Sequence, residues 1–233
     1  MANKPETAGF SEPIRTPKTA DNPALLFDIS LDDVVKKGTL DDYLRVREIE
    51  QRKLFLDNLI EVSNAMDIAM SILQYNRDDL DAEKKDPNYV RKPIQLYINS
   101  PGGSVLAGVI LLDAIEQSKT PVHTINVGYS YSMAFMVFIV GSVRYAMPNA
   151  TFLLHEGTES YEDSVSKAHD MQRFMARMNN RLKKLVLDHT KITSEEFDQK
   201  RSVEWYMFAK DAKKKGIVDY IVGEKGCAID NIV

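Results

Sequence analysis

The sequence has little cysteine and little histidine. Cys227 is the only cysteine among 233 residues, so the chain cannot carry an intrachain disulfide framework or a zinc site built from several cysteines. A single thiol also fits a reducing compartment, and we interpret Cys227 as a small buried residue. The 4 histidines include no pair with metal-binding spacing. We therefore expect neither a metal nor a cofactor.

Long apolar runs and excess positive charge are missing as well. The longest apolar run, Met133 to Val140, has eight residues, whereas a membrane-spanning helix needs about 20. Residues 1–21 lack the apolar segment of a secretory signal. Lys and Arg total 30 against 34 for Asp and Glu, so the chain is not polycationic. We expect a cytoplasmic protein whose main partner is neither membrane nor nucleic acid.

The first 40 residues differ in composition from the rest. They contain four prolines and scattered charges with little apolar periodicity, which is typical of a flexible arm. The whole chain is 44% hydrophobic, enough for a sizeable core. We predict a flexible N-terminal arm over residues 1–40 and one folded domain over residues 41–233.

Strand and helix patterns alternate along this domain. The predicted strands are 53–56, 94–98, 122–127, 151–155 and 217–222, and the predicted helices are 62–73, 105–117, 163–189 and 209–215. Residues 76–92 are highly charged and contain Pro87, so we expect a solvated surface connection there. The alternation predicts an α/β fold.

Two candidate catalytic residues lie at the edges of apolar segments. Ser132 directly precedes the run from Met133 to Val140, and His155 follows the apolar segment Phe152–Leu154. A serine hydroxyl becomes a nucleophile when a nearby base takes its proton, and histidine, with an unperturbed pKa near 6.5, suits that role. The two residues together indicate a serine hydrolase.

A glycine-containing turn, Asn99–Ser104, joins a predicted strand to a predicted helix. Gly102 and Gly103 allow backbone conformations that expose N–H groups at a helix N-terminus. The turn lacks the lysine and the spacing of a P-loop. Next to Ser132, the N–H groups of Gly103 and Met133 would form the two-donor oxyanion hole of acyl transfer, worth about 3 kcal/mol per donor.

Taken together, these segments resemble the Clp protease proteolytic subunit. Tyr97–Val105, Gly128–Met133 and Pro148–His155 match that family in order and spacing, and the resemblance covers about residues 45–222. It implies the ClpP/crotonase-like α/β spiral of β-β-α units with an inserted helical handle, here about 163–189. It also implies that residues 41–233 form a peptidase domain.

The resemblance also assigns the catalytic residues. Ser132 falls on the nucleophile and His155 on the base, and the two N–H groups named above fall on the oxyanion donors. The third residue is usually aspartate, and counting along the matched stretch places Glu204 there. Glutamate can orient an imidazole as aspartate does. Asp198, six residues earlier, is the alternative.

The implied activity is that of a Clp-type serine endopeptidase. Such an enzyme cleaves unfolded polypeptides into short peptides inside homo-oligomeric rings, typically heptamers stacked as a tetradecamer. A hexameric AAA+ ATPase unfoldase, of the ClpX or ClpA type, feeds these rings. The chain has no Walker loop, so ATP would bind to the partner.

Several positions depart from the family pattern. Tyr129–Tyr131 replaces the small residues that usually precede the nucleophile, Ala134 stands where glycine is common, and Glu156–Gly157 replaces the usual Gln-Pro. Three alternatives therefore remain open. They are a catalytically weakened structural or regulatory ring subunit, a phage-type capsid-maturation protease of the same superfamily, and a crotonase-type acyl-CoA enzyme.

Overall fold

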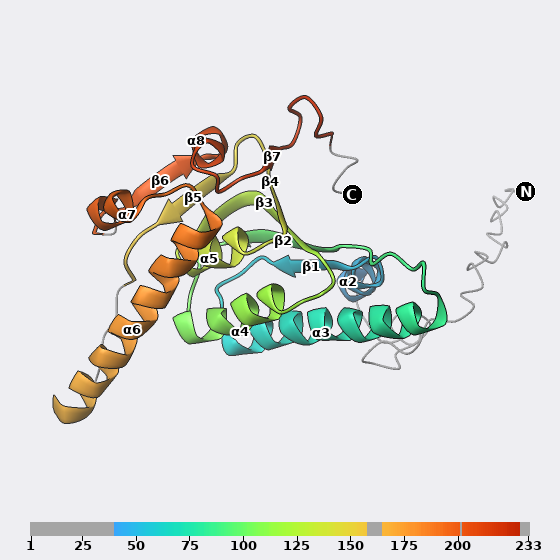
Figure 1. The fold of residues 1–233 in the computed structure, drawn as a ribbon, viewed down its shortest axis with the longest axis horizontal. Helices are drawn as coiled ribbons and strands as arrows, with labels where there is room; N and C mark the ends of the chain where they lie inside the picture. The colour runs from blue at the N-terminus through green and yellow to red at the C-terminus, as the bar shows by residue number, and fades with distance from the viewer. Residues whose placement is uncertain (1–39, 158–164, 201, 229–233) are drawn as a thin grey trace, which may run out of the picture.

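A computed structural model describes residues 40–157, 165–200 and 202–228. The arm predicted over residues 1–40 therefore lies outside the described residues except for its last position. The first two residues of the helix predicted from 163 also lie outside them. The described residues form an α/β structure, shown in Figure 1, which confirms the predicted fold class.

The structure contains seven strands and seven helices within the described residues. The strands are β1 (Lys53–Leu56), β2 (Ile94–Ser100), β3 (Val122–Tyr131), β4 (Val143–Ala146), β5 (Thr151–Leu154), β6 (Trp205–Phe208) and β7 (Tyr220–Ile221). The helices are α2 (Leu40–Glu50), α3 (Val62–Lys85), α4 (Val105–Glu116), α5 (Met133–Ile139), α6 (Val165–His189), α7 (Ser194–Lys200) and α8 (Ala209–Lys214).

The sheet divides at β3. Strands β1, β2, β3, β4 and β7 lie side by side in that order, and every neighbouring pair is parallel. β3 is 10 residues long, so residues 123–126 pair with β4 while residues 129–131 pair with β5. β6 then pairs with β5 in the antiparallel direction. β5 and β6 therefore extend the sheet at the carboxyl end of β3.

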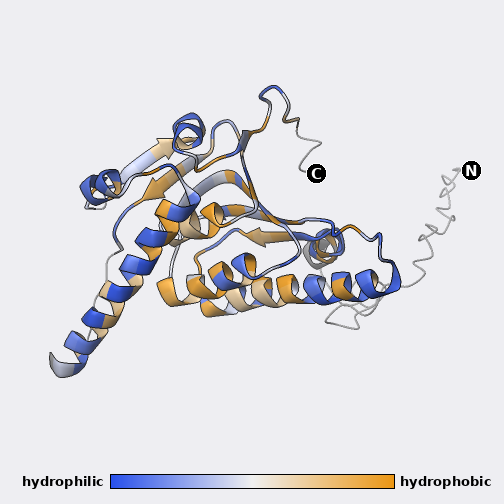
Figure 2. Ribbon diagram, viewed as in Figure 1, coloured by the Kyte–Doolittle hydropathy of each residue, from blue (hydrophilic) through white to orange (hydrophobic). Residues whose placement is uncertain are grey.

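The apolar core surrounds α5. All seven residues of this helix are buried, so no face of it meets water. Figure 2 shows apolar residues concentrated in α5 and in the strands beside it. A helix that is apolar on every side is stable only inside a protein, which explains why this segment has no polar face in the sequence. α5 follows directly after Ser132, so the core fixes the position of that residue.

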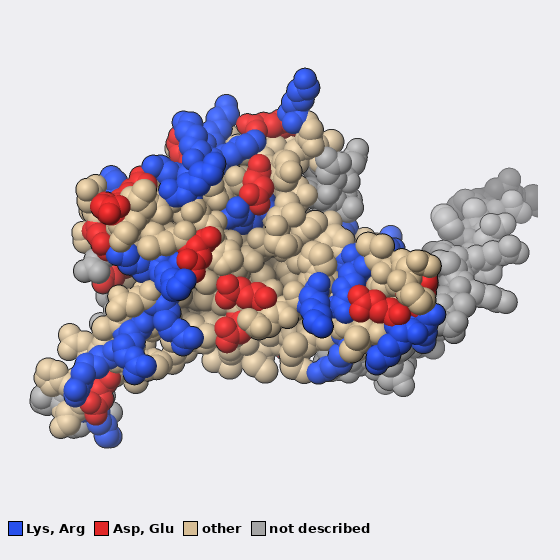
Figure 3. Space-filling view, viewed as in Figure 1, with Lys and Arg blue, Asp and Glu red and all other residues tan. Residues whose placement is uncertain are grey.

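The helix α6 extends away from the body of the domain (Figure 1). Its 25 residues agree with the long helix predicted over 163–189, and it is the helical handle that the resemblance implied. Only Met175 and Val186 among its described side chains are buried. Figure 3 shows Lys and Arg gathered along it. Within the described parts of the chain, no helix is long and apolar enough to cross a membrane.

One prediction about the fold is wrong, namely the solvated connection over residues 76–92. α3 runs through Lys85, well past the predicted end at residue 73. The reason is Asp79, which is fully buried on the inner face of the helix. Because its partners come from distant segments, the local charge pattern gave no sign of this burial.

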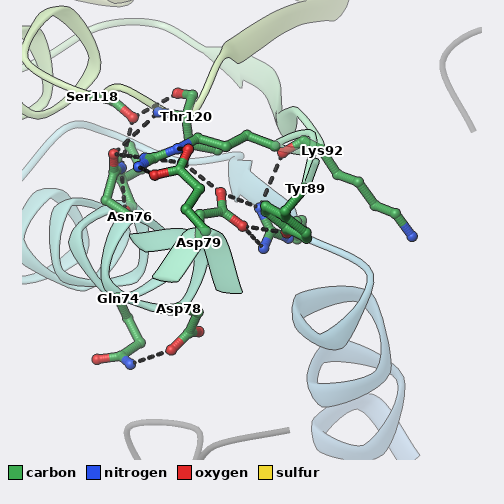
Figure 4. Close-up of polar contacts among 12 residues, drawn as sticks. Gln74, Asn76, Asp78, Asp79, Tyr89, Lys92, Ser118 and Thr120 are labelled. Carbon is green, nitrogen blue, oxygen red and sulfur yellow. Dashed lines mark hydrogen bonds and ion pairs between the residues drawn. The ribbon is translucent and has the colours of Figure 1, made fainter. Parts of the chain in front are cut away.

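The cluster around Asp79 joins four segments of the chain (Figure 4). Arg52, directly before β1, donates two hydrogen bonds to the Asp79 carboxylate. Tyr89 and Thr120 donate one each, both at 2.6 Å. Burial opposes the charge of Asp79, but these hydrogen bonds outweigh it and hold the pKa of its carboxyl below the ordinary value. We refer to these four residues as the Asp79 cluster.

Other differences concern strand boundaries. β3 extends to Tyr131, four residues past its predicted end, and the last strand is only Tyr220–Ile221. β4 and β6 were not predicted. β6 is a run of four apolar and aromatic residues, and a run this short does not by itself distinguish a strand from a piece of helix.

Candidate active site

Parallel pairing of β2, β3 and β5 brings together the glycine turn, Ser132 and His155. Ser100, at the end of β2, pairs with Ser130 of β3, so the glycine turn that follows β2 lies beside the end of β3. Tyr131, the last residue of β3, pairs with Leu153 of β5. His155 follows two residues after Leu153, and Ser132 follows Tyr131. All three motifs therefore meet at the carboxyl ends of neighbouring parallel strands.

Ser132 occupies a sharp turn between β3 and α5. Its φ is 54° and its ψ is −122°, a conformation that is costly for any residue other than glycine. Hydrogen bonds hold it there, because its N–H donates to the Leu153 carbonyl and its carbonyl accepts from the Phe135 N–H, both at 3.0 Å. A strained strand-to-helix turn of this kind exposes a nucleophile.

The glycine turn packs directly against this serine. A Cβ atom on Gly102 would lie 2.6 Å from the Tyr131 carbonyl oxygen and 2.9 Å from the Met133 nitrogen, so only glycine allows this approach. The turn is anchored on its other side, where the Ile60 N–H donates to the Gly102 carbonyl at 2.7 Å. The Ser104 N–H donates back to the Ile60 carbonyl at 3.0 Å. The backbone around Gly102 is therefore fixed against the Ser132 turn.

His155 and Glu204 form the polar pair of the site. β5 and β6 run antiparallel with Leu154 opposite Trp205, so the next opposed residues are His155 and Glu204. The His155 Nδ1 atom lies 2.8 Å from the Glu204 Oε1 atom. A carboxylate at Nδ1 favours the tautomer with its proton on Nδ1, which leaves Nε2 as the basic nitrogen. The side chains are 23% and 56% exposed, respectively.

Asp198, the alternative third residue, has a different partner. It lies on α7 and accepts two hydrogen bonds from the Lys183 ammonium group of α6, at 2.8 and 2.7 Å. The carboxylate that is hydrogen-bonded to His155 is thus that of Glu204.

One cavity of about 310 Å³ unites the predicted site residues other than Glu204. Ser132, His155, Gly103 and Met133 all line it. Its remaining lining is partly apolar and partly polar, and comprises Pro101, Val105, Met136, Glu156, Gly157, Asn179, Asn180, Leu182, Lys183 and Phe197. The cavity therefore offers an apolar wall next to a serine and an imidazole.

A larger cavity, about 640 Å³, lies between α3 and α4. Apolar residues such as Met66, Leu73 and Ile110 line it together with charged ones such as Arg77 and Asp113. Its lining contains no histidine and no cysteine. Volume alone therefore does not mark the reactive site, and we place the chemistry beside Ser132.

Sequence reasoning did not identify two aromatic residues near the site, Phe197 in the cavity wall and Tyr206 beside Tyr131. Tyr206 of β6 meets the Tyr131 ring edge-on, with ring centroids 5.7 Å apart and an interplanar angle of 81°. Tyr131 also packs against Tyr129 and shares a hydrogen bond with the Thr151 hydroxyl at 2.9 Å. Glu204 and Tyr206 stand two residues apart in the sequence, which places them on the same side of a strand. This spacing becomes informative only once β6 is known to be a strand.

The other candidate ligands lie apart from the site. Burial lowers the pKa of His123 on β3, and His189 at the end of α6 contacts Glu116 at 3.1 Å. Cys227 is buried, as predicted, and its burial raises the pKa of the thiol. The described part of the chain contains no group of three or more histidine, cysteine or acidic residues that could hold a metal.

A comparison with known protein families agrees with this geometry. The family model described as Clp protease matches residues 39–225, which is well over half of the chain. The matched region includes the glycine turn, the strained serine, the histidine and the glutamate described above. The chain therefore belongs to the Clp protease family, a family of peptidases.

Proposed function

We propose that the protein is a serine endopeptidase in which Ser132 is the nucleophile, His155 the general base and Glu204 the residue that orients His155. The observation that supports this most directly is the 2.8 Å contact between His155 Nδ1 and Glu204 Oε1. It occurs beside a cavity that both Ser132 and His155 line. The contact leaves the second imidazole nitrogen available to the serine hydroxyl.

The reaction follows from these positions. The Ser132 hydroxyl oxygen attacks the peptide carbonyl carbon while His155 Nε2 takes the hydroxyl proton. The Glu204 carboxylate stabilises the resulting imidazolium. The imidazolium then donates its proton to the leaving amine, which departs and leaves an acyl-enzyme on Ser132. A water molecule, activated by the same imidazole, hydrolyses the ester and restores the serine.

The negative charge on the tetrahedral intermediate needs donors. Met133 is the first residue of α5, and the first N–H groups of a helix have no partner within the helix. Gly103 is held across the cavity by the pairing of its turn with Ile60. We assign these two N–H groups as the oxyanion donors, which act in a preorganised site at a helix N-terminus.

The substrate we propose is unfolded polypeptide, which the enzyme cleaves into short peptides. The apolar wall formed by Met136, Leu182 and Phe197 suits an apolar side chain next to the cleaved bond. Family membership supports assembly into rings, and we propose stacked heptamers. The partner would be an AAA+ ATPase unfoldase of the ClpX or ClpA type, and the compartment the cytoplasm.

Active-site labelling tests the proposal. A fluorophosphonate probe should label the assembled protein at Ser132, and the Ser132→Ala variant should not be labelled. Ser130→Ala is the matched control, because it removes a neighbouring hydroxyl two residues away, and it should retain labelling. If the assembled native protein fails to react with the probe, the proposed nucleophile is wrong.

A second candidate function is a ring subunit with weakened catalysis. The 56% exposure of the Glu204 side chain favours it, because a solvated carboxylate interacts less strongly with an imidazole than a buried one. The two candidates differ in a simple assay. Hydrolysis of a fluorogenic peptide by the purified homo-oligomer supports the enzyme, whereas activity that needs a second, different subunit supports the weakened ring member.

A further inference from the structure

The position of Glu204 raises a question about how its carboxylate is held. One oxygen, Oε1, meets His155. Glutamate has one more rotatable bond than the aspartate usual at this place in the family, and the side chain is more than half exposed. A flexible, solvated carboxylate orients an imidazole poorly. Some neighbouring group is therefore needed to restrict it.

The sheet register places Tyr206 next to this carboxylate. Tyr206 lies opposite Leu153 of β5, and Leu153 lies beside Tyr131 of β3, so these three residues form one row across three strands. His155 and Glu204 form the next row on the same side of the sheet, beyond the Leu154–Trp205 pair, because His155 follows Leu153 by two residues and Glu204 precedes Tyr206 by two. Residues two apart on a strand face the same side. Tyr206 and Glu204 therefore share one face of the sheet.

The backbone draws these two residues closer still. The Tyr206 N–H donates to the Glu204 carbonyl at 3.2 Å. The pKa of the Tyr206 phenol is raised, first by desolvation and then by the charge and hydrogen bonding of the Glu204 carboxylate. A phenol with a raised pKa keeps its proton at neutral pH, so it serves as a hydrogen-bond donor.

The Tyr206 ring is itself supported. Tyr131 meets it edge-on, and the hydrogen bond between the Tyr131 and Thr151 hydroxyls fixes the Tyr131 ring. Edge-to-face contacts of this kind have a preferred geometry and limit rotation of both rings. The unusual tyrosine and the unusual glutamate are thus linked through Tyr206.

We propose that Tyr206 is a positioning residue whose hydroxyl donates a hydrogen bond to the Glu204 carboxylate and holds it against His155 Nδ1. Tyr131 keeps the Tyr206 ring in place. The inference rests on the proposed function, because Tyr206 acts only through Glu204. It adds a fourth side chain to the proposed triad, and this fourth residue compensates for the longer reach of glutamate.

A double-mutant cycle tests the inference. Tyr206→Phe, which removes only the hydroxyl, should lower kcat on a fluorogenic peptide by about 5- to 20-fold with KM changed by less than about 2-fold, the size expected for one hydrogen bond to a charged group. In a Glu204→Ala background the same change should cause no further loss. The rate of fluorophosphonate labelling at Ser132 gives the same comparison in variants too slow for turnover.

Controls separate positioning from packing. Tyr220→Phe removes an exposed phenol hydroxyl on β7, outside the proposed site, and should leave kcat unchanged. An equal loss from Tyr206→Phe in both backgrounds would show that the hydroxyl acts on packing, and an unchanged kcat in the native background would show that it does not act at all. Either result overturns the inference alone. Absence of Ser132 labelling in the native assembled protein would instead overturn the proposed function.

Discussion

The carboxylates of Asp79 and Glu204 both have a nitrogen-bearing side chain as hydrogen-bond partner, but their surroundings are opposite. Asp79 is fully buried and accepts from Arg52, Tyr89 and Thr120. Glu204 is 56% exposed and its carboxylate is hydrogen-bonded to His155. A buried carboxylate without enough partners would destabilise the fold, so its environment must be complete. The Glu204 carboxylate can remain near solvent because it stabilises little of the fold.

This contrast shows how the molecule separates stability from chemistry. The Asp79 cluster joins the start of β1, the second half of α3 and the loop before β3, and none of its residues lines the cavity beside Ser132. Substitutions there should change the free energy of unfolding and leave the chemistry of folded molecules intact. Substitutions at Glu204 should lower the catalytic rate and leave the free energy of unfolding nearly unchanged. The following predictions are ordered from the largest expected effect to the smallest.

The largest effect should come from Glu204→Ala. Loss of the carboxylate leaves His155 without its orienting partner, and kcat on a fluorogenic peptide should fall by about 10³-fold. Because the pair is exposed, the free energy of unfolding should change by less than about 0.5 kcal/mol. Asp198→Ala is the matched control and should retain most of the activity. Measurements of kcat and of urea denaturation on both variants test this prediction. A large loss of unfolding free energy in Glu204→Ala would contradict the proposed separation of stability from chemistry.

Asp79→Ala should have the opposite result. It leaves the Arg52 guanidinium partly buried without its carboxylate, which should cost about 3 kcal/mol of unfolding free energy. The kcat per folded, labelled molecule should stay within about 2-fold of the native value, because no residue of the cavity is touched. Active-site titration with the fluorophosphonate supplies the concentration of folded enzyme. A specific loss of kcat at full labelling would contradict the separation of the two regions.

The pH dependence of stability tests the role of Asp79. Its folded-state pKa lies below the ordinary value, so its contribution to stability is present above the unfolded-state pKa of about 3.9 and is lost as the pH falls through the folded-state value. The difference in unfolding free energy between the native protein and Asp79→Asn should be constant between about pH 5 and 7 and should shrink below about pH 4. Urea titrations across this range measure it. A difference that widens on acidification would have the wrong sign for a depressed pKa.

The smallest effect is expected at Ser130. Its side-chain oxygen is buried and, among the described residues, is the one buried side-chain nitrogen or oxygen without a hydrogen-bond partner. Ser130→Ala removes that polar atom, so stability should be unchanged or should rise by up to about 1 kcal/mol. Ser100→Ala is the useful contrast, because the Ser100 hydroxyl donates to the Asn58 carbonyl at 2.6 Å. If Ser130→Ala lowers the free energy of unfolding as much as Ser100→Ala does, the Ser130 hydroxyl has a hydrogen-bond partner.

The sequence could predict much of the site because its residues stand at strand ends. Ser132 and His155 each border an apolar segment, and in an α/β sheet the residues at the carboxyl ends of the strands commonly form the ligand-binding site. The choice between Glu204 and Asp198 was less accessible, because it depends on the pairing of β6 with β5. β6 is only four residues long, and so short an apolar run does not distinguish a strand from a helix, so neither the strand nor the place of Tyr206 could be recognised beforehand.

Much of the fold was predictable for the same reason, but β4, β6 and the second half of α3 were not predicted. Short apolar segments indicated β1, β2, β3 and β5, and apolar residues at a spacing of three or four indicated the long helix α6. The second half of α3 was missed because a charged residue ordinarily signals solvent, whereas Asp79 is satisfied by Arg52, Tyr89 and Thr120 from outside the helix. Burial of a charge depends on long-range partners, and local sequence carries no record of them.

The separation of His155 from Glu204 along the chain has a consequence for biosynthesis. The two residues are 49 positions apart, with α6 and α7 between them. At about 5–20 residues per second, a ribosome needs about 2–10 s to add that stretch. During this interval a nascent chain can already contain the serine, the imidazole and both backbone donors, but not the acidic partner. Until Glu204 is added, the proposed triad lacks the residue that orients His155, so such a nascent chain should hydrolyse peptides far more slowly than a chain that contains Glu204.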